Sequence, residues 1–481
     1  MVTQPLDGRF RGVLRSHHGL GAWDLVRIGA CAGLLGCGGT ASPATTTAAT
    51  PTAPTATAAP TTTATTSKPA PATPDPGPAD LQAVADAAFE YGYPLTETMR
   101  VCDLFPAVNF VHRRRTLATP QDTAVVLPNN DTLYASSCVY LGASWVTLTM
   151  PPAHGRYQSV QVFDAYTTTA ALRGPHQVPA AGAKYILHLK GSSTAGLPDG
   201  IPIVEVATPY AFVLFRTLVN GPTDLADAAA AQDGVDVTAH ATDAPVRAGE
   251  TPGGSPAQEF FEKLMQRLAQ NPPPAAEAAL VASFATAGVR PSLTPAGSDA
   301  TPAQRAAWET AYTQGLARLA AAAQAPRALR GAWAFPDPNV ATPGTNYTLR
   351  AITARVGLFA LPPSESIYPS TTAAGTTSHV LALPRNWPPI DPKGFWSLTM
   401  YNSNGFLVDN AIHRYSISNR TPGAHLEPDG SLKIYLQCTD PGGAKTANWL
   451  PAPCGRFSVT MRLYLPTGAA LEPSFTLPPL D

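Results

Sequence analysis

Short segments in which hydrophobic and polar residues alternate flank a central region with a different pattern. Alternation with a period of two is typical of strands that bury one face. Before the central region, strands are expected at residues 145–150, 157–163, 184–190 and 210–219. After it, strands are expected at residues 380–383, 395–401, 432–437 and 457–465. Turn signals such as Asp429-Gly430 separate these segments, so the spacing favours antiparallel sandwiches or jelly rolls.

The central region repeats its apolar residues at intervals of three and four, as amphipathic helices do. Ser255 and Gln258 form a capping box with a proline between them, directly ahead of an apolar stripe. A second helix is expected at residues 275–287. A third begins at Thr301 and Gln304, which repeat the capping motif, and runs into an alanine-rich segment. These local start signals predict a helical insertion between two β-rich regions.

The N-terminal part of the chain carries the pattern of an exported, lipid-anchored protein. Arg27 precedes a short apolar stretch, and Leu34-Leu35-Gly36-Cys37 reads as a lipobox in which Cys37 takes the lipid. Residues 40–78 are almost entirely Thr, Ala, Pro and Ser, which offer little apolar surface to offset the entropy lost on ordering. The sequence therefore predicts a membrane-anchored lipoprotein of the cell envelope, whose folded body is held off the membrane by a spacer.

The rest of the chain is expected to be a mainly β, α+β protein. A helix is predicted at residues 79–104, with Pro94 interrupting it. Two antiparallel β-sandwich or jelly-roll-like domains then enclose the helical insertion. The expected divisions are a signal segment at 1–37, a tether at 38–78, a first β-rich domain at 79–250, a helical insertion at 251–336 and a second β-rich domain at 337–481.

Charge and cysteine content narrow the possible partners. The formal net charge is -1 and charged residues make up 14% of the chain, which disfavours nucleic acid as a partner. In an oxidising compartment, a disulfide is expected between Cys438 and Cys454, and Cys102 with Cys138 is the matching pair. The alternative is four buried free thiols. No Cys-x-x-Cys motif or helical His pair accompanies them, so no metal site is expected.

Several longer motifs resemble two families that occur as a pair, the domains of unknown function 1254 and 1214. The first resemblance covers residues 89–220 and rests on Tyr91-Gly92-Tyr93-Pro94, on residues 128–134, on Arg156-Tyr157 and on Asp164-Ala165-Tyr166-Thr167. The second covers residues 346–466 and rests on residues 395–401, 405–410, 414–417 and 448–453. This resemblance implies a β-rich, two-domain exported protein with a helical insertion. It implies no agreed activity and no cofactor.

The motif around Asp131 has two interpretations. In the functional one, Asp131 is a general base or metal carboxylate, and Asn129 and Asn130 orient a ligand hydroxyl near Tyr134. In the structural one, the Asn and Asp side chains bond their own backbone at the turn into a strand at 132–140.

A second polar cluster contains Asp409, Asn410, Arg414 and Tyr415. In the functional interpretation, Asp409 pairs with Asp131 across the domain interface as two working carboxylates. In the structural one, Asp409 forms an ion pair with Arg414 and braces a loop. Further candidate ligand contacts are Arg156, Tyr166 and Trp449, although the Trp449 ring is also suited to covering the end of a sheet.

These residues support three hypotheses of function. The first is binding of a small polar or glycan-like ligand between the two β domains. The second is a carboxylate-dependent hydrolase that uses Asp131 and Asp409, and the third is an oligomeric envelope scaffold. The sequence leaves open whether the protein is an enzyme, because the common hydrolase and nucleotide-binding motifs are absent from it.

Overall fold

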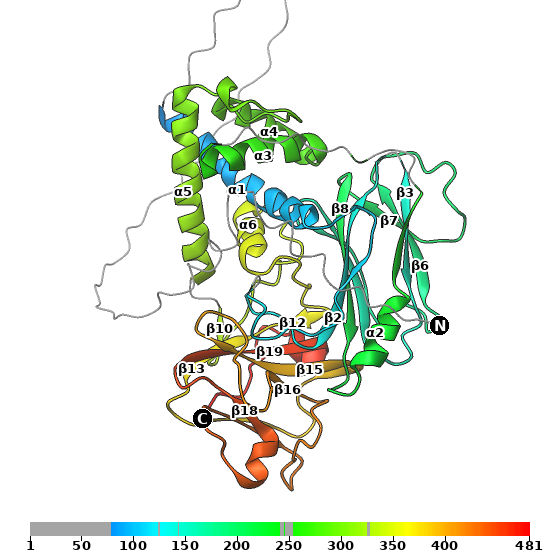
Figure 1. The fold of residues 1–481 in the computed structure, drawn as a ribbon, viewed down its shortest axis with the longest axis vertical. Helices are drawn as coiled ribbons and strands as arrows, with labels where there is room; N and C mark the ends of the chain where they lie inside the picture. The colour runs from blue at the N-terminus through cyan, green and yellow to red at the C-terminus, as the bar shows by residue number, and fades with distance from the viewer. Residues whose placement is uncertain (1–77, 124–125, 143, 241–244, 246–253, 325–327) are drawn as a thin grey trace, which may run out of the picture.

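The computed structural model describes residues 78–481, except 124–125, 143, 241–244, 246–253 and 325–327. The predicted signal segment, the lipobox and nearly all of the tether lie outside the described residues. The described part is an α+β structure with two β-rich parts and a helical layer (Figure 1). The mainly β, α+β fold predicted from the sequence is therefore confirmed.

The first β-rich part is a sandwich of two sheets. One sheet has the order β1-β2-β8-β4-β5, with β1 His112–Arg113, β2 Thr132–Tyr140, β8 Tyr210–Leu218, β4 Gln158–Asp164 and β5 Thr169–Arg173. The other has the order β7-β6-β3-β9, with β7 Ile203–Val206, β6 Ala183–Leu189, β3 Trp145–Met150 and β9 Asp236–Ala239. Neighbouring strands are antiparallel except β6 and β7. Apolar side chains from both sheets share one core.

Helices cover the outer face of the five-stranded sheet. They are α1 (Pro78–Asp103), α3 (Pro256–Gln270), α4 (Ala278–Ser283), α5 (Pro302–Gln324) and α6 (Tyr347–Val356). Their core includes Phe163 and Phe212 from the sheet, so strands β4 and β8 are buried on both faces. This double burial explains why the 157–163 segment has no cleanly polar face.

The helix starts follow the predicted capping. The Ser255 hydroxyl accepts a hydrogen bond from the Gln258 backbone N–H at 3.2 Å. Thr301 and Gln304 cap each other's backbone N–H groups at 3.2 and 2.9 Å. The predicted interruption at Pro94 is wrong, because α1 runs through it without a break. The flanking Tyr93 and Leu95 are buried among the other helices, and this packing outweighs the lost backbone hydrogen bond.

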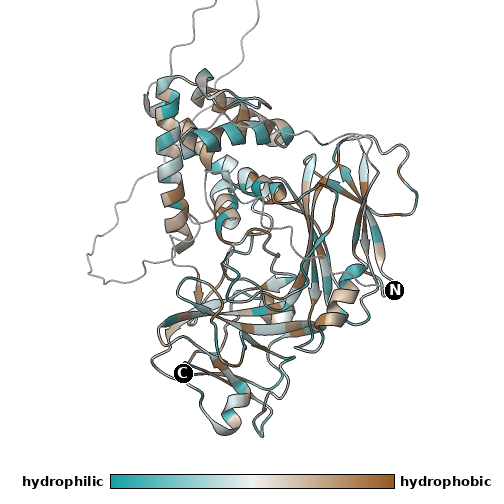
Figure 2. Cartoon of the chain, viewed as in Figure 1, coloured by the Kyte–Doolittle hydropathy of each residue, from teal (hydrophilic) through white to brown (hydrophobic). Residues whose placement is uncertain are grey.

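The second β-rich part is also a sandwich. Its larger sheet contains β10 Leu329–Arg330, β11 Trp333–Ala334, β13 Ser370–Ala374, β19 Arg456–Pro466, β15 Ile390–Asn402 and β16 Ser416–Ser418 in this order, and β12 Ser366–Ile367 also pairs with β19. The smaller sheet contains β14 His379–Leu383, β17 Leu432–Gln437 and β18 Trp449–Pro451. Both sheets contribute to one apolar core, and the brown segments of Figure 2 follow these strands.

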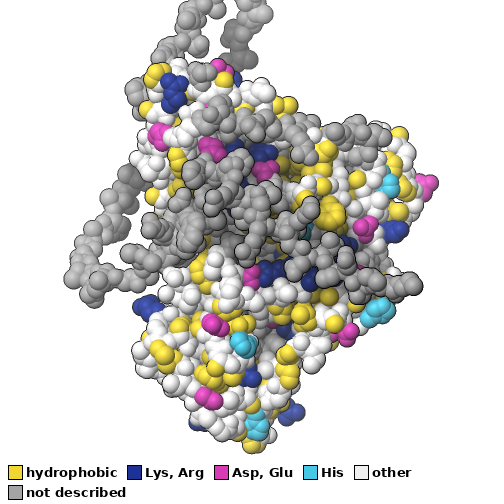
Figure 3. Space-filling model, viewed as in Figure 1, with side chains coloured by type: hydrophobic (Ala, Val, Ile, Leu, Met, Phe, Trp, Pro, Cys, Tyr) yellow, Lys and Arg dark blue, Asp and Glu magenta, His cyan; other side chains and the backbone are white. Residues whose placement is uncertain are grey.

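Both predicted disulfides are present. Cys102 at the end of α1 is bonded to Cys138 of β2, and Cys438 is bonded to Cys454. The first bond attaches the helical layer to the five-stranded sheet. Charged side chains are dispersed over the visible face in Figure 3, in keeping with the low charge of the chain. None of the helices in the described part combines the length and apolar content needed to cross a bilayer.

Candidate functional site

The segment before β2 connects the two β-rich parts. The Asn129 side-chain oxygen accepts hydrogen bonds from the backbone N–H groups of Asp131 and Thr132 at 2.6 and 3.2 Å. Its amide nitrogen donates to the Tyr464 hydroxyl on β19 at 2.8 Å. The neighbouring Asn130 donates to the Ala118 carbonyl at 2.6 Å. These bonds agree with the structural interpretation, in which the asparagines hold the turn into the strand.

Asp131 belongs to a buried ion pair across the same junction. Its carboxylate accepts hydrogen bonds from the Ser397 hydroxyl at 2.6 Å and from the Arg420 guanidinium at 2.8 Å. The Asp131 side chain is 1% exposed and that of Arg420 is 13% exposed. Burial lowers the pKa of Arg420, and the charge of Asp131 opposes that shift. The Asp131 carboxylate is therefore enclosed by side chains of the second β-rich part.

Arg462 and Tyr401 extend this junction. Arg462 donates to the Leu127 carbonyl at 3.0 Å, to the Tyr401 hydroxyl at 2.6 Å and to the Thr399 hydroxyl at 2.8 Å. Tyr401 in turn donates to the Pro128 carbonyl at 2.8 Å. We call residues 127–131 with their partners in the second part, Ser397, Tyr401, Arg420, Arg462 and Tyr464, the interdomain clasp.

The second predicted cluster lies in loops of the second part. Arg414 donates to the backbone carbonyls of Thr446, Ala447 and Trp449 at 2.9 to 3.0 Å. The predicted ion pair between Asp409 and Arg414 is not among the ion pairs of the described residues, because three carbonyls take up the guanidinium. Asp409 is exposed, whereas Asp131 is buried.

The remaining residues of that cluster also support loops and strands. Asn410 bonds the backbone of Val408 and Arg414, and the Tyr415 hydroxyl lies 3.4 Å from His413. The Trp449 ring is buried and donates to the Gln437 carbonyl at 2.8 Å. Trp449 begins β18, the edge strand of the smaller sheet, and its ring is buried there.

Tyr166 lies in a third group of buried polar residues between α1, β4 and α6. Its hydroxyl donates to the Asn271 carbonyl at 2.8 Å. Nearby, Arg350 forms an ion pair with Glu277 at 3.0 Å, and both are buried. Burial raises the pKa of Asp164 in this group to about 6. Tyr134, the other tyrosine among the candidates, is half-buried with the Arg216 guanidinium 6.0 Å from its ring centre.

Arg156 is the candidate that borders an open hollow. Its two terminal nitrogens hold the Asp224 carboxylate in a bidentate ion pair, with one contact at 2.8 Å. It also donates to the Leu218 carbonyl. Asp224 directly precedes α2 (Leu225–Asp233), so this ion pair fixes the N-terminal end of that helix. The ion pair lowers the pKa of Asp224.

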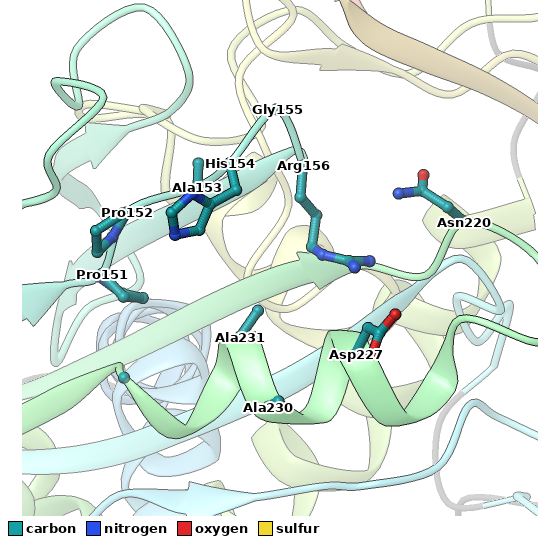
Figure 4. Close-up of a pocket in the computed structure, with 11 residues that line it drawn as sticks. Pro151, Pro152, Ala153, His154, Gly155, Arg156, Asn220, Asp227, Ala230 and Ala231 are labelled. Atoms are coloured by element: carbon teal, nitrogen blue, oxygen red, sulfur yellow. The ribbon is translucent and has the colours of Figure 1, made fainter.

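The hollow is a groove of about 440 Å³ between α2 and the loop at residues 151–156. Both segments connect one sheet of the first sandwich to the other, since the loop joins β3 to β4 and α2 joins β8 to β9. Figure 4 shows Asn220, Asp227 and the Arg156 guanidinium at one end of the groove and the prolines at the other.

The face of α2 that lines the groove is nearly free of large side chains. Asp227, Ala230, Ala231 and Gly234 lie at intervals of three and four, so they share one face of the helix. His154, Asn220 and Asp227 are exposed at the groove. His154 also has a positive φ of 48°, a backbone conformation uncommon for residues other than glycine.

Two arginines of the basic run at residues 112–115 hold the other end of α2. Arg113 donates to the carbonyls of Gln232 and Val235, and Arg115 donates to the Ala229 carbonyl and pairs with Asp233. Cationic groups at the C-terminal carbonyls of a helix stabilise it. Arginines therefore fix the wall of the groove at both of its ends.

The sequence interpretation missed most of this groove. Arg156 was expected to bind a ligand, but His154, Asn220 and Asp227 were not identified, and α2 itself was not predicted. The available signal was the helical spacing of one acidic and three small residues in 227–234. No group of three or more His, Cys, Asp or Glu side chains in the described ranges is arranged to hold a metal ion.

Two family models match the chain. The model described as Protein of unknown function (DUF1254) matches residues 108–239, and that described as Protein of unknown function (DUF1214) matches residues 369–468. The predicted pairing of these two families is therefore confirmed, with the first in the N-terminal half and the second in the C-terminal half.

Two solved structures are similar to this chain. The VPA0106 protein from Vibrio parahaemolyticus has a TM-score of 0.64 and 20% identity, covering 83% of this chain and 99% of its own. An uncharacterised protein from Burkholderia cenocepacia has a TM-score of 0.42 and 14% identity, covering 81% and 92%. The likeness to the VPA0106 protein shows a shared fold. No protein with a curated description matches the chain.

Proposed function

Starting from a chain that pairs these two families of unknown function, we propose that the protein is a tethered binding protein of the cell envelope. Its ligand is a small polyhydroxylated molecule, such as a short glycan, bound in the groove between α2 and residues 151–156. The observation that carries this proposal is the set of exposed polar groups at Arg156, beside a floor of small and apolar residues.

The chemistry of these groups suits a sugar. The Asp227 carboxylate accepts hydrogen bonds, the Asn220 amide both donates and accepts, and the His154 imidazole does either. A sugar hydroxyl also donates and accepts, so one hydroxylated face satisfies this mixed set. The prolines and alanines of the groove offer apolar surface to the C–H groups of the ring.

The groove is also pre-organised. Arg156 holds Asp224 at the start of α2, and Arg113 and Arg115 hold the carbonyls at its end. A site whose walls are already fixed loses less conformational entropy when it binds a ligand. In the interdomain clasp the Asp131 carboxylate and the Tyr401 hydroxyl are hydrogen-bonded within the protein, and Nε and Nη1 of Arg420 are buried without a partner in the described part of the chain. The groove therefore offers more exposed polar groups than the interface between the two β-rich parts.

We also propose that the protein is attached to a membrane through its N-terminal segment. Lipidation of Cys37 and the spacer that follows it hold the binding domain near a membrane surface. Metabolic labelling with an alkyne fatty acid, followed by membrane fractionation, tests this in the bacterial host. Wild type is expected to incorporate the label and Cys37→Ser to lose it. Equal labelling of wild type and Cys37→Ser would contradict lipidation at Cys37.

Isothermal titration calorimetry with neutral oligosaccharides tests the groove, using the full chain in detergent. Replacing Asp227 by Asn or Asn220 by Ala is expected to weaken binding about tenfold, since the first change removes a charged acceptor oxygen and the second removes the whole amide. Asp80→Asn, an exposed carboxylate on α1, serves as the charge-matched control. Binding that is unaffected by either groove variant would contradict the proposal.

A further inference from the structure

A second groove lies beside the 151–152 segment, because Gly182 of its lining packs against the backbone of Met150 and Pro151. It has a volume of about 490 Å³ and is lined by parts of β5 and β6 and by the turns at residues 177–182 and 200–202. Its polar lining comprises Arg173, Gln177, Lys184 and Tyr185. No Asp or Glu belongs to this lining, so the groove carries positive charge from two side chains.

Neither Arg173 nor Lys184 has a carboxylate partner among the described residues. The Arg173 guanidinium lies over the Tyr185 ring at 5.4 Å, which fixes the plane of its donors. Its one hydrogen bond in the described residues goes to the Leu172 carbonyl. Lys184 is exposed and takes part in none of the ion pairs of the described residues. A planar guanidinium next to an ammonium suits a carboxylate or phosphate group.

The linings of the two grooves are adjacent in the fold. Met150, which precedes the prolines of the first groove, pairs with Ala183 of the second. A Cβ on Gly182 would lie 2.5 Å from the Met150 carbonyl oxygen and 2.9 Å from the carbonyl carbon of Pro151. Gly182 also has a φ of 83°. Only glycine allows this close approach, which brings the lining of the second groove against the segment that lines the first.

We propose that the ligand is an acidic glycan that spans both grooves. Neutral hydroxyls lie against Asp227 and Asn220, and a carboxylate or phosphate substituent of an adjacent sugar binds Arg173 and Lys184. This inference rests on the proposed function of the first groove and names the class of its ligand. The Asp227 carboxylate would repel an acidic substituent in the first groove. The negative charge of the ligand is therefore expected in the second groove.

An aldotriouronic acid, which carries one uronic acid beside two neutral sugars, and its methyl ester are the probes, because they share one backbone and differ in charge. Calorimetry on the full chain in detergent is expected to show the acid binding roughly tenfold more tightly than the ester, as two charge pairs at a partly exposed site give. This preference should decrease as salt is added. Inorganic phosphate, titrated separately, identifies binding of a free anion.

Lys184→Gln is expected to reduce the preference for the acid from about tenfold to about threefold, because the pair with Arg173 remains, and to leave the affinity for the ester unchanged. Lys190→Gln, the same substitution at the exposed far end of β6, is the control and should preserve the preference. Thermal unfolding of both variants verifies that they fold.

The outcomes separate the two proposals. Equal binding of acid and ester, lost in Asp227→Asn, would overturn the acidic glycan and leave the first groove as a sugar site. Binding of phosphate alone, with no binding of either oligomer, would overturn the spanning ligand and leave an isolated anion site. No binding of any probe would overturn both.

Discussion

Replacing Asp131 by Asn tests whether residues 127–131 join the two β-rich parts or form a ligand-binding site. The substitution removes the charge opposite Arg420, whose own side chain is only 13% exposed, and leaves that guanidinium without its carboxylate. Removing one member of a buried ion pair typically costs 3–5 kcal/mol. Asp224 also stabilises the charge of Arg420 from a greater distance, so we expect the lower end, about 3 kcal/mol. That loss is roughly a hundredfold change in the folding equilibrium constant.

Urea unfolding followed by tryptophan fluorescence measures this effect on the full chain. Arg420→Gln alone and the double variant complete a cycle, and the coupling between the two side chains should exceed about 1 kcal/mol. Asp227→Asn is the control, because that carboxylate is exposed and should change the stability by less than about 0.5 kcal/mol.

A wild-type-like unfolding curve for Asp131→Asn would refute the structural role of the pair. A loss of ligand binding without a loss of stability would go further and restore Asp131 as a ligand contact. That result would support the first hypothesis, in which a ligand binds between the two β domains.

Three further predictions concern other parts of the structure. Replacing Cys102 and Cys138 together by Ser is expected to lower the unfolding free energy by roughly 4 kcal/mol, from a loop with a sequence separation of 36, and unchanged urea midpoints would contradict this. The pKa of Asp164 is raised from 3.8 to about 6, so its carboxyl favours the folded state below its ordinary pKa and this stability is lost as pH rises through about 6. Asp164→Asn should remove roughly 3 kcal/mol of that pH dependence, which urea titrations between the two pKa values would detect, and parallel pH profiles would count against it. Arg115→Gln should speed amide hydrogen exchange in α2 while changing global stability by less than about 1 kcal/mol, and unchanged exchange would show that α2 does not depend on this contact.

Local patterns predicted much of the fold. Period-two alternation located strands β3, β6, β17 and β19 close to their observed limits, and the capping motifs located the starts of α3 and α5. These signals depend on neighbours within a few residues, which a sequence displays directly. The disulfides were also predictable, since an even number of cysteines in the folded body, together with the expectation of an oxidising compartment, narrows the possible pairings.

The contacts of the candidate residues were less predictable because their partners are distant in the chain. Ser397 and Arg420 lie 266 and 289 residues from Asp131. No local pattern indicates that these side chains meet. The sequence around a carboxylate in an Asn-rich turn is therefore the same whether the carboxylate forms an ion pair or is free to bind a ligand. Helix α2 was missed for a related reason, since its alanines give no amphipathic contrast and arginines from a distant strand and loop fix its ends.

Hydrogen–deuterium exchange with and without a saturating acidic oligosaccharide tests the central claim most directly. The ligand is expected to slow exchange in α2, in residues 151–156 and in the turn at 177–182, which together surround the two grooves. The segment at 127–131 should exchange equally in both states, because the interdomain clasp is already closed. Protection confined to 127–131 and 409–415, with the grooves unchanged, would contradict the account and place the ligand between the two β-rich parts.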